Sequence, residues 1–232
     1  MDINKYENDS QIFLSETVLK RTEFKNNFYK RIILDEDTSS TLFDSHYIYH
    51  IAWASRKIFE INPNLHVDFS SSLNFCTTIS AYRKVKFYDY RPVNLKLSNL
   101  ECDYCDLSSE DFSVGKYKSV SCMHVVEHIG LGRYGDPLDS MGDIKAIENL
   151  KKSVTPGGDL LFVVPCGRPS IHFNAHRIYS AKSIVDYFGK NFTLIEFYFI
   201  TGIDNQPPIS NPDLNITNNF DYGCGCFHFK CN

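Results

Sequence analysis

Short apolar runs alternate along the middle of the chain with segments in which apolar residues recur at helical spacing. Five runs have the length and composition of buried strands: residues 65–69, 85–88, 100–105, 118–126 and 160–165. Segments that can form helices lie between them, at residues 75–84 and 142–153. Strands that alternate with helices predict a parallel sheet covered by helices on both faces.

The two ends of the chain follow other patterns. Residues 12–29 and 47–61 read as helical, and Asn62-Pro63-Asn64 ends the second of these helices. We therefore expect a helical extension over residues 1–62 and one α/β domain over residues 63–232. Residues 192–200 and 222–230 are aromatic, alternating segments, which predict an antiparallel pair of strands at the sheet edge.

Composition and charge narrow the class of function. The 232 residues are 43% hydrophobic and 22% charged, as expected for a folded domain of ordinary size. The net charge of −4 argues against a protein that coats nucleic acid. No apolar run reaches bilayer-spanning length and no secretory leader is visible. We therefore expect a cytoplasmic chain without membrane insertion, whose eight cysteines are thiols.

The first predicted strand ends at Asp68, and Ser70, Ser72 and Asn74 follow it at alternate positions. A nucleotide-binding loop has this spacing but carries glycines, which let the backbone approach the ligand. Serine is small and asparagine tolerates positive φ, so such a turn could keep its shape. The alternative is a serine N-cap that only starts the next helix.

The second and third predicted strands also end in carboxylates. Asp89 lies about 20 residues after the turn, where a ribose ligand is expected, although an exposed loop aspartate is the alternative. Asp106 follows the third strand, and Asp103 competes with it for the same role. The expected cofactor-binding residues are Asp68, Ser70, Ser72, Asp89 and Asp106.

Three segments are dense in functional residue types: residues 127–139 (EHIGLGRYGDPLD), 173–179 (FNAHRIY) and 222–227 (YGCGCF). They resemble the signature of an uncharacterised family, domain of unknown function family 268. The strand endings are similar to those of class I S-adenosylmethionine-dependent methyltransferases. The resemblance runs from about His66 to the C-terminus. It implies a Rossmann-like mixed sheet, S-adenosylmethionine as cofactor and a bacterial setting in surface-polysaccharide biosynthesis, but it does not supply a reaction.

Candidate catalytic residues lie at predicted strand ends. His128 and His176 have the residue type that accepts a proton from a sugar hydroxyl near neutral pH, and Glu127 adjoins His128. Arginines and a glycine-rich loop beside them suit a phosphate or carboxylate. An Arg133–Asp136 ion pair that only holds the loop is the alternative. The expected substrate-binding residues are Arg133, Tyr134, Asp136, Asn174, Arg177 and Arg168.

We expect no metal site. His124-x-x-Glu127-His128 spells the inverted zincin motif, but on a strand its two histidines lie about 13 Å apart. The pair Cys102 and Cys105 has no second C-x-x-C at zinc-ribbon spacing. The C-terminal cysteines, Cys224, Cys226 and Cys231, fit the packing of an edge strand better than a metal.

The leading hypothesis is O-methylation of a sugar or nucleotide-sugar. One alternative is a different sugar-modifying enzyme on the same scaffold that has lost S-adenosylmethionine binding, which the missing glycines favour. The other is a non-catalytic binding subunit. Fold alone does not choose among them, and the sequence leaves the acceptor and the oligomeric state open.

Overall fold

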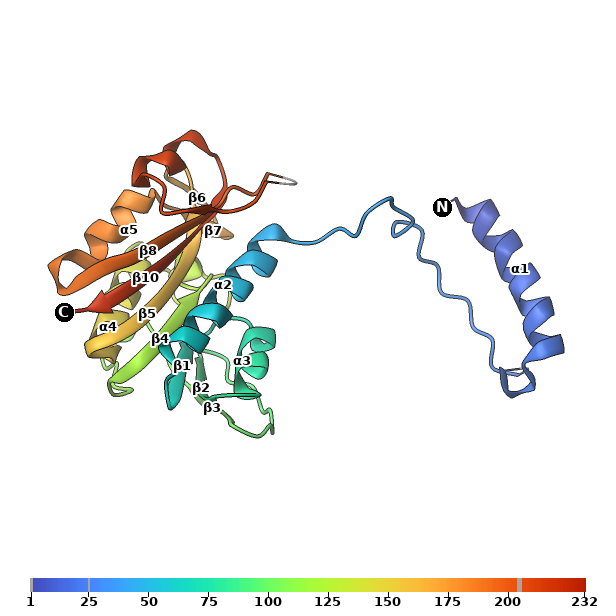
Figure 1. Ribbon diagram of the computed structural model, residues 1–232, viewed down its shortest axis with the longest axis horizontal. Helices are drawn as coiled ribbons and strands as arrows, with labels where there is room; N and C mark the ends of the chain where they lie inside the picture. Colours follow the sequence, from blue (N-terminus) through green and yellow to red (C-terminus); the bar gives the residue numbers. More distant parts are fainter. Residues whose placement is uncertain (1, 25, 204–205) are drawn as a thin grey trace. The chain divides into compact units, whose positions relative to one another are not determined.

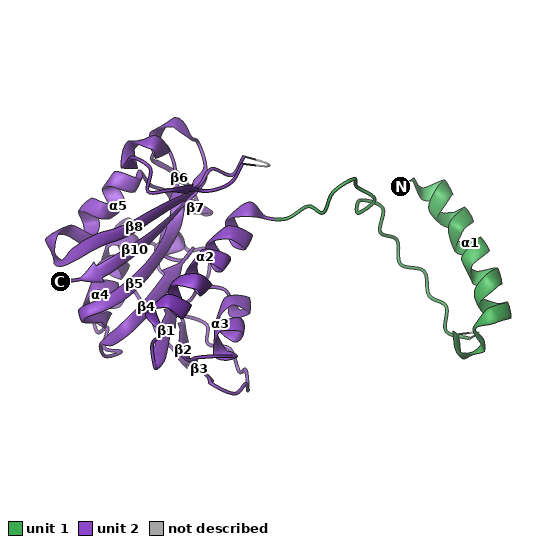
Figure 2. Cartoon of the chain, in the orientation of Figure 1, with its two compact units in different colours: residues 1–43 green, residues 44–232 purple. Residues whose placement is uncertain are grey.

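A computed structural model describes residues 2–24, 26–203 and 206–232. The chain divides into two compact units, residues 1–43 and residues 44–232 (Figure 2). The first unit contains helix α1 (Ile3–Lys20) and a short 3-10 turn, Thr22–Phe24. The Asp2 side chain caps α1 by accepting a hydrogen bond from the Lys5 amide at 2.8 Å.

One mixed sheet forms the centre of the second unit, with the strand order β3-β2-β1-β4-β5-β10-β8-β9 (Figure 1). Its parallel strands are β1 (Leu65–Phe69), β2 (Lys84–Asp89), β3 (Leu100–Tyr104), β4 (Tyr117–Met123) and β5 (Val154–Cys166). The strand pair expected near the C-terminus is present as β8 (Phe192–Ile200) and β10 (Gly223–Cys231). The sequence therefore predicted the fold class correctly.

The position of β10 differs from the expected sheet edge. β10 lies between β5 and β8 and runs antiparallel to both. Its side chains are buried on both faces, with Cys226 in one hydrophobic cluster and Phe227 in the other. On this side the edge of the sheet is the two-residue strand β9 (Ile209–Ser210), which pairs with β8. An alternating pattern predicts a strand with one face in solvent, whereas both faces of β10 pack against apolar layers. Alternation alone therefore could not place β10 inside the sheet.

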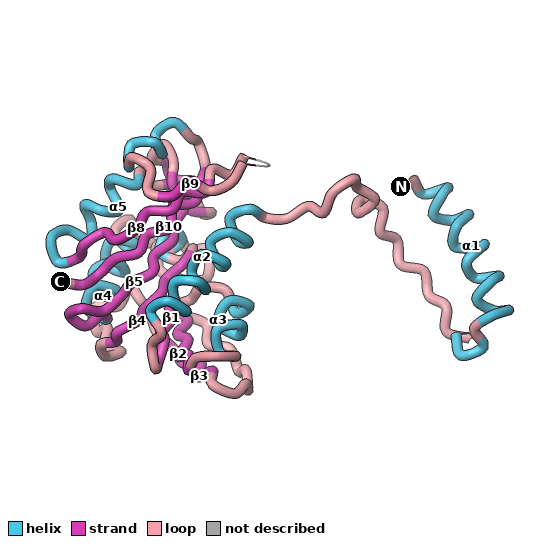
Figure 3. Tube along the Cα trace, in the orientation of Figure 1, coloured by secondary structure: helices cyan, strands magenta, loops and turns pink. Residues whose placement is uncertain are grey.

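Helices cover both faces of the sheet, as predicted (Figure 3). On one face α2 (Ser45–Ile61) and α3 (Leu73–Ser80) contribute Trp53, Ile58 and Ile79 to a buried cluster. On the other face α4 (Gly142–Ser153) and α5 (Ala181–Phe188) contribute their apolar sides. None of the described helices has both the length and the apolar character of a bilayer-spanning segment.

Helix α2 belongs to the second unit, so the structure divides the chain at residue 43 and not at the expected residue 62. The reason is its packing. Trp53 is 4% exposed, and its indole Nε1 donates a hydrogen bond to Glu196 Oε1 of β8 at 2.9 Å. Lys57 forms an ion pair with the same carboxylate at 2.6 Å. These contacts join α2 to the C-terminal half of the sheet.

The segment after β4 also differs from its prediction. The strand ends at Met123, His124 turns the chain with φ of 57°, and residues Val126–His128 form a 3-10 turn, η2. Further along, a hairpin of β6 (Ser170–His172) and β7 (His176–Ile178) precedes α5. The 3-10 turns Gly189–Asn191 and Leu214–Asn219 lie on either side of β8 and β9.

Candidate functional site

A pocket lies where β1, β2, β3 and β4 end, the edge at which open α/β sheets bind ligands. Segments after all four strands contribute to its wall, together with the loop after η2. Of the expected site residues it contains Ser70, Asp89, Asp106, His128, Tyr134 and Asp136. It also contains residues that the sequence analysis did not select, among them Tyr90, Arg91, Ser108 and His124.

The turn after β1 combines the two alternatives left open by the sequence. Ser70 has φ of 56°, the conformation that glycine favours, and its amide donates to the Tyr88 carbonyl at 2.7 Å. Ser70 also lines the pocket. Ser72 is the N-cap of α3 and accepts a hydrogen bond from the Phe75 amide at 3.2 Å. Thus Ser70 faces the pocket, whereas Ser72 starts the helix.

Asp68 is fully buried beneath that turn and does not line the pocket. Its Oδ1 accepts a hydrogen bond from the Ser71 amide at 3.0 Å, and its Oδ2 accepts one from the Ser121 hydroxyl. His66 Nε2 lies 2.8 Å from the same hydroxyl. Burial raises the pKa of Asp68 to about 6, although the serine hydrogen bonds oppose this. Asp68 therefore stabilises the turn through hydrogen bonds and does not line the pocket.

The carboxylates after β2 and β3 both line the pocket. Asp89 Oδ1 accepts a hydrogen bond from the Arg91 amide at 2.7 Å. Asp106 Oδ1 accepts from the amide and the hydroxyl of Ser108 at 2.9 and 2.8 Å. In each case Oδ2 has no hydrogen bond among the described residues. Asp103, the competing residue, is exposed and lies outside this pocket.

The turn η2 brings two histidines to one buried carboxylate. Glu127 is 1% exposed, and its Oε1 lies 3.0 Å from His124 Nδ1 and 3.8 Å from His128 Nε2. The other ring nitrogen of His128, Nδ1, lies 2.6 Å from the Ala175 carbonyl oxygen. The wide separation of the histidines expected on a strand is therefore wrong, because the chain leaves the strand at His124.

The loop of residues 130–139 is held by Asp136. Its carboxylate accepts hydrogen bonds from the amides of Gly130 at 2.7 Å and Tyr134 at 3.1 Å. Arg133 does not pair with this carboxylate; its guanidinium donates to the Ala175 carbonyl at 3.1 Å. The alternative of an Arg133–Asp136 ion pair is therefore absent from the described contacts, although Asp136 does hold the loop.

The remaining expected substrate residues lie apart from the pocket or are already engaged. Arg177 is 5% exposed; it donates to the Ile129 carbonyl at 2.7 Å and lies 3.6 Å from Asp143 Oδ2. Arg168 pairs with Asp221 on the surface, in a separate hollow that His176 also lines. Asn174 is exposed and lines neither pocket. Arg177 thus holds the loop and does not face a ligand.

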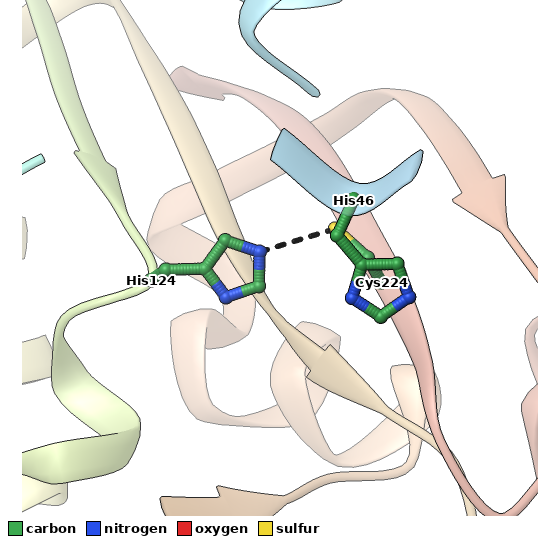
Figure 4. A group of neighbouring side chains, drawn as sticks. All are labelled: His46, His124 and Cys224. Atoms are coloured by element: carbon green, nitrogen blue, oxygen red, sulfur yellow. Dashed lines mark hydrogen bonds between the residues drawn. The ribbon is translucent and has the colours of Figure 1, made fainter. Parts of the chain in front are cut away.

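A second group of functional side chains adjoins the pocket. His46 at the start of α2, His124 after β4 and Cys224 at the start of β10 place one ligand atom each within 4.8 Å of one another (Figure 4). His124 Nε2 lies 3.4 Å from Cys224 Sγ. Burial lowers the pKa of His46 to about 4, so its ring is neutral at physiological pH. No local sequence pattern links residues so far apart in the chain.

Comparison with known proteins supports the resemblance inferred from the sequence. The family model described as "Caenorhabditis protein of unknown function, DUF268" matches residues 94–202. No curated protein sequence matches the chain significantly.

Solved structures establish the fold. The N-methyltransferase NodS from Bradyrhizobium japonicum WM9, in complex with S-adenosyl-L-homocysteine, aligns with a TM-score of 0.56 at 11% identity, over 96% of this chain and 98% of that chain. The YcgJ protein from Bacillus subtilis aligns with a TM-score of 0.52 at 11% identity, over 80% and 99%. TehB from Haemophilus influenzae aligns with 0.52 at 12% identity, over 84% and 64%. The chain has the fold of class I methyltransferases.

Proposed function

We propose that this chain is an S-adenosylmethionine-dependent methyltransferase that methylates a hydroxyl group of a sugar or nucleotide-sugar. The observation that carries the proposal is one pocket that joins Asp89 and Asp106, at the ends of β2 and β3, with His128 after β4. A nucleoside cofactor bound by the two carboxylates would therefore lie beside a basic group, His128, at the ligand-binding edge of a methyltransferase fold. The likeness to methyltransferase structures supports the cofactor, and the site residues support the acceptor.

The cofactor half of the pocket has the groups that an adenosine needs. Asp89 Oδ2 can accept hydrogen bonds from ribose hydroxyls, and Asp106 Oδ2 can accept one from the adenine amine. Ser70 takes up the positive φ of the missing glycine, so the backbone keeps the required turn. This turn supports nucleoside binding despite the absent glycines.

The acceptor half has a base with a defined tautomer. A carbonyl oxygen only accepts hydrogen bonds, so His128 Nδ1 carries the proton that it shares with Ala175. In the neutral ring Nε2 is then free to take a proton from a hydroxyl group. Glu127, at 3.8 Å, stabilises the imidazolium that forms. The hydroxyl oxygen attacks the sulfonium methyl group, the carbon–sulfur bond breaks, and S-adenosylhomocysteine leaves with the electron pair.

Two arginines beside Tyr134 favour a phosphate-bearing acceptor. The guanidinium groups of Arg91 and Arg133 lie 4.5 and 5.2 Å from the ring centre of Tyr134, which itself lines the pocket. Two arginines can hold a diphosphate by bidentate hydrogen bonds. We place the reaction in the cytoplasm, within surface-polysaccharide biosynthesis, where acceptors of this kind are made.

Calorimetric titration with S-adenosylhomocysteine tests the cofactor site. We expect binding to the unmodified chain and at least tenfold weaker binding to Asp89→Asn and Asp106→Asn, since each loses a carboxylate acceptor. Asp103→Asn is the matched control, because that carboxylate lies on β3 outside the pocket. Absence of binding at millimolar concentration would overturn the proposal.

Mass spectrometry of reaction products then tests the reaction. With S-adenosylmethionine and a pool of nucleotide-sugars, we expect a product heavier by one methyl group, and its loss in His128→Gln. A product with any other mass change would favour a different sugar-modifying enzyme. Biological activity that survives loss of both His128 and His176 would favour the binding subunit.

A further inference from the structure

His46, His124 and Cys224 come from three separate elements and converge on one point (Figure 4). Cys224 is fully buried and His46 is 7% exposed, so little water reaches them. Their donor atoms, two imidazole nitrogens and one sulfur, all lie within 4.8 Å of one another. We propose that these three side chains bind a zinc ion, which ties α2 to β4 and β10. The proposal is independent of the methyltransferase assignment.

The spacing of the donor atoms agrees with tetrahedral zinc. Bond lengths of about 2.3 Å to sulfur and about 2.0 Å to nitrogen place a sulfur and a nitrogen ligand about 3.5 Å apart. The distance from His124 Nε2 to Cys224 Sγ is 3.4 Å. This pair can therefore hold a zinc ion as it stands. The limit of 4.8 Å for the whole group means that His46 needs to move by at most about an ångström.

Glu127 gives the group the second layer that zinc histidines have. Its Oε1 lies 3.0 Å from His124 Nδ1, so that nitrogen can donate to the carboxylate while Nε2, on the Cys224 side of the ring, binds the metal. Its Oε2 is buried and has no hydrogen-bond partner among the described residues. A buried carboxylate that lacks a partner is costly unless positive charge lies nearby. A cation on the far side of His124 supplies such a charge.

The kind of ligand selects the metal. One thiolate with two imidazoles suits zinc, whereas magnesium and calcium require oxygen ligands, which this group does not offer. His124 also lines the pocket, so the metal lies directly behind the pocket wall. Through Glu127 it would also fix the position of η2 and thereby of His128.

Cobalt(II) titration of the metal-free full chain tests the site. Cobalt bound to a thiolate in tetrahedral geometry gives strong near-ultraviolet absorption, and zinc should displace it. We expect one equivalent to bind, a higher melting temperature with zinc, loss of the thiolate band in Cys224→Ser, and at least tenfold weaker binding in His46→Gln. Cys231→Ser is the matched control, because this cysteine lies at the other end of β10.

Cys224→Ser and His46→Gln lie on different elements, so the test stays valid if one of these variants fails to fold. Circular dichroism would show such a failure. No cobalt band in the unmodified chain would overturn the proposal and leave a hydrogen-bonded thiol–imidazole pair. A band that persists in folded Cys224→Ser, or that disappears in Cys231→Ser, would also overturn it.

Discussion

Asp68 is a fully buried carboxyl group whose ionisation should govern how stability depends on pH. Its pKa is raised from an ordinary 3.8 to about 6, because burial penalises the charged form more than the hydrogen bonds from Ser121 and Ser71 favour it. His66 provides no positive charge, since burial lowers its own pKa to about 3. The perturbation is Asp68→Asn, which keeps the shape and removes the ionisation.

The sign and size of the effect of Asp68 on the unfolding free energy follow from the linkage between proton binding and folding. Between pH 4 and 6 the folded protein holds a proton on Asp68 that the unfolded chain has released, so this residue favours folding at low pH. That stabilisation is lost as pH rises through about 6. A pKa raised from 3.8 to about 6 corresponds to about 3 kcal/mol. The unfolding free energy of the unmodified chain, relative to Asp68→Asn, should fall by about that amount between pH 4 and 7.5.

Urea denaturation at several pH values measures the difference, and other titrating groups cancel between the two proteins. Asp111→Asn is the control, because Asp111 is exposed and its substitution should leave the pH profile unchanged. Parallel pH profiles for the unmodified chain and Asp68→Asn would refute the reasoning, since Asp68 would then ionise in the folded state as it does in the unfolded chain.

Substitutions at three other residues test the turns around the pocket. Arg177→Met should lower the unfolding free energy by about 3 kcal/mol in urea denaturation, because a buried ion pair and three carbonyl contacts are broken. Gly130→Ala should weaken acceptor binding in calorimetry, because its Cβ would lie 2.0 Å from the Asp139 oxygen and displace the loop. Ser70→Gly should keep S-adenosylhomocysteine binding, whereas Ser70→Val should weaken it severalfold, because β-branched residues resist φ of 56°.

The sheet and its pocket carboxylates could be predicted because they depend on local pattern. Buried strands read as apolar runs, and β1 and α4 begin and end where the sequence indicated. Since the ends of parallel strands share one edge, the sequence predicts Asp89 and Asp106 at the same edge, and both line the pocket. Asp106 lines the pocket and Asp103 does not, because Asp106 lies beyond the end of β3.

What escaped prediction depends on single torsions and on distant contacts. Val125 and Val126 read as strand, but the positive φ of His124 turns the chain just before them. The cluster of His46, His124 and Cys224 joins residues 78 to 178 positions apart, which no local spacing reveals. Arg177 resembled a ligand residue because charge in a motif does not show burial.

The insertion of β10 between β5 and β8 has a consequence for how the protein is made. Synthesis delivers β5 and β8 before β10, and each then has an unpaired edge that only β10 covers. The nascent chain therefore carries two exposed strand edges until β10 has left the ribosome. A chain that stops before Gly223 keeps those edges permanently, and intermolecular strand pairing and aggregation follow.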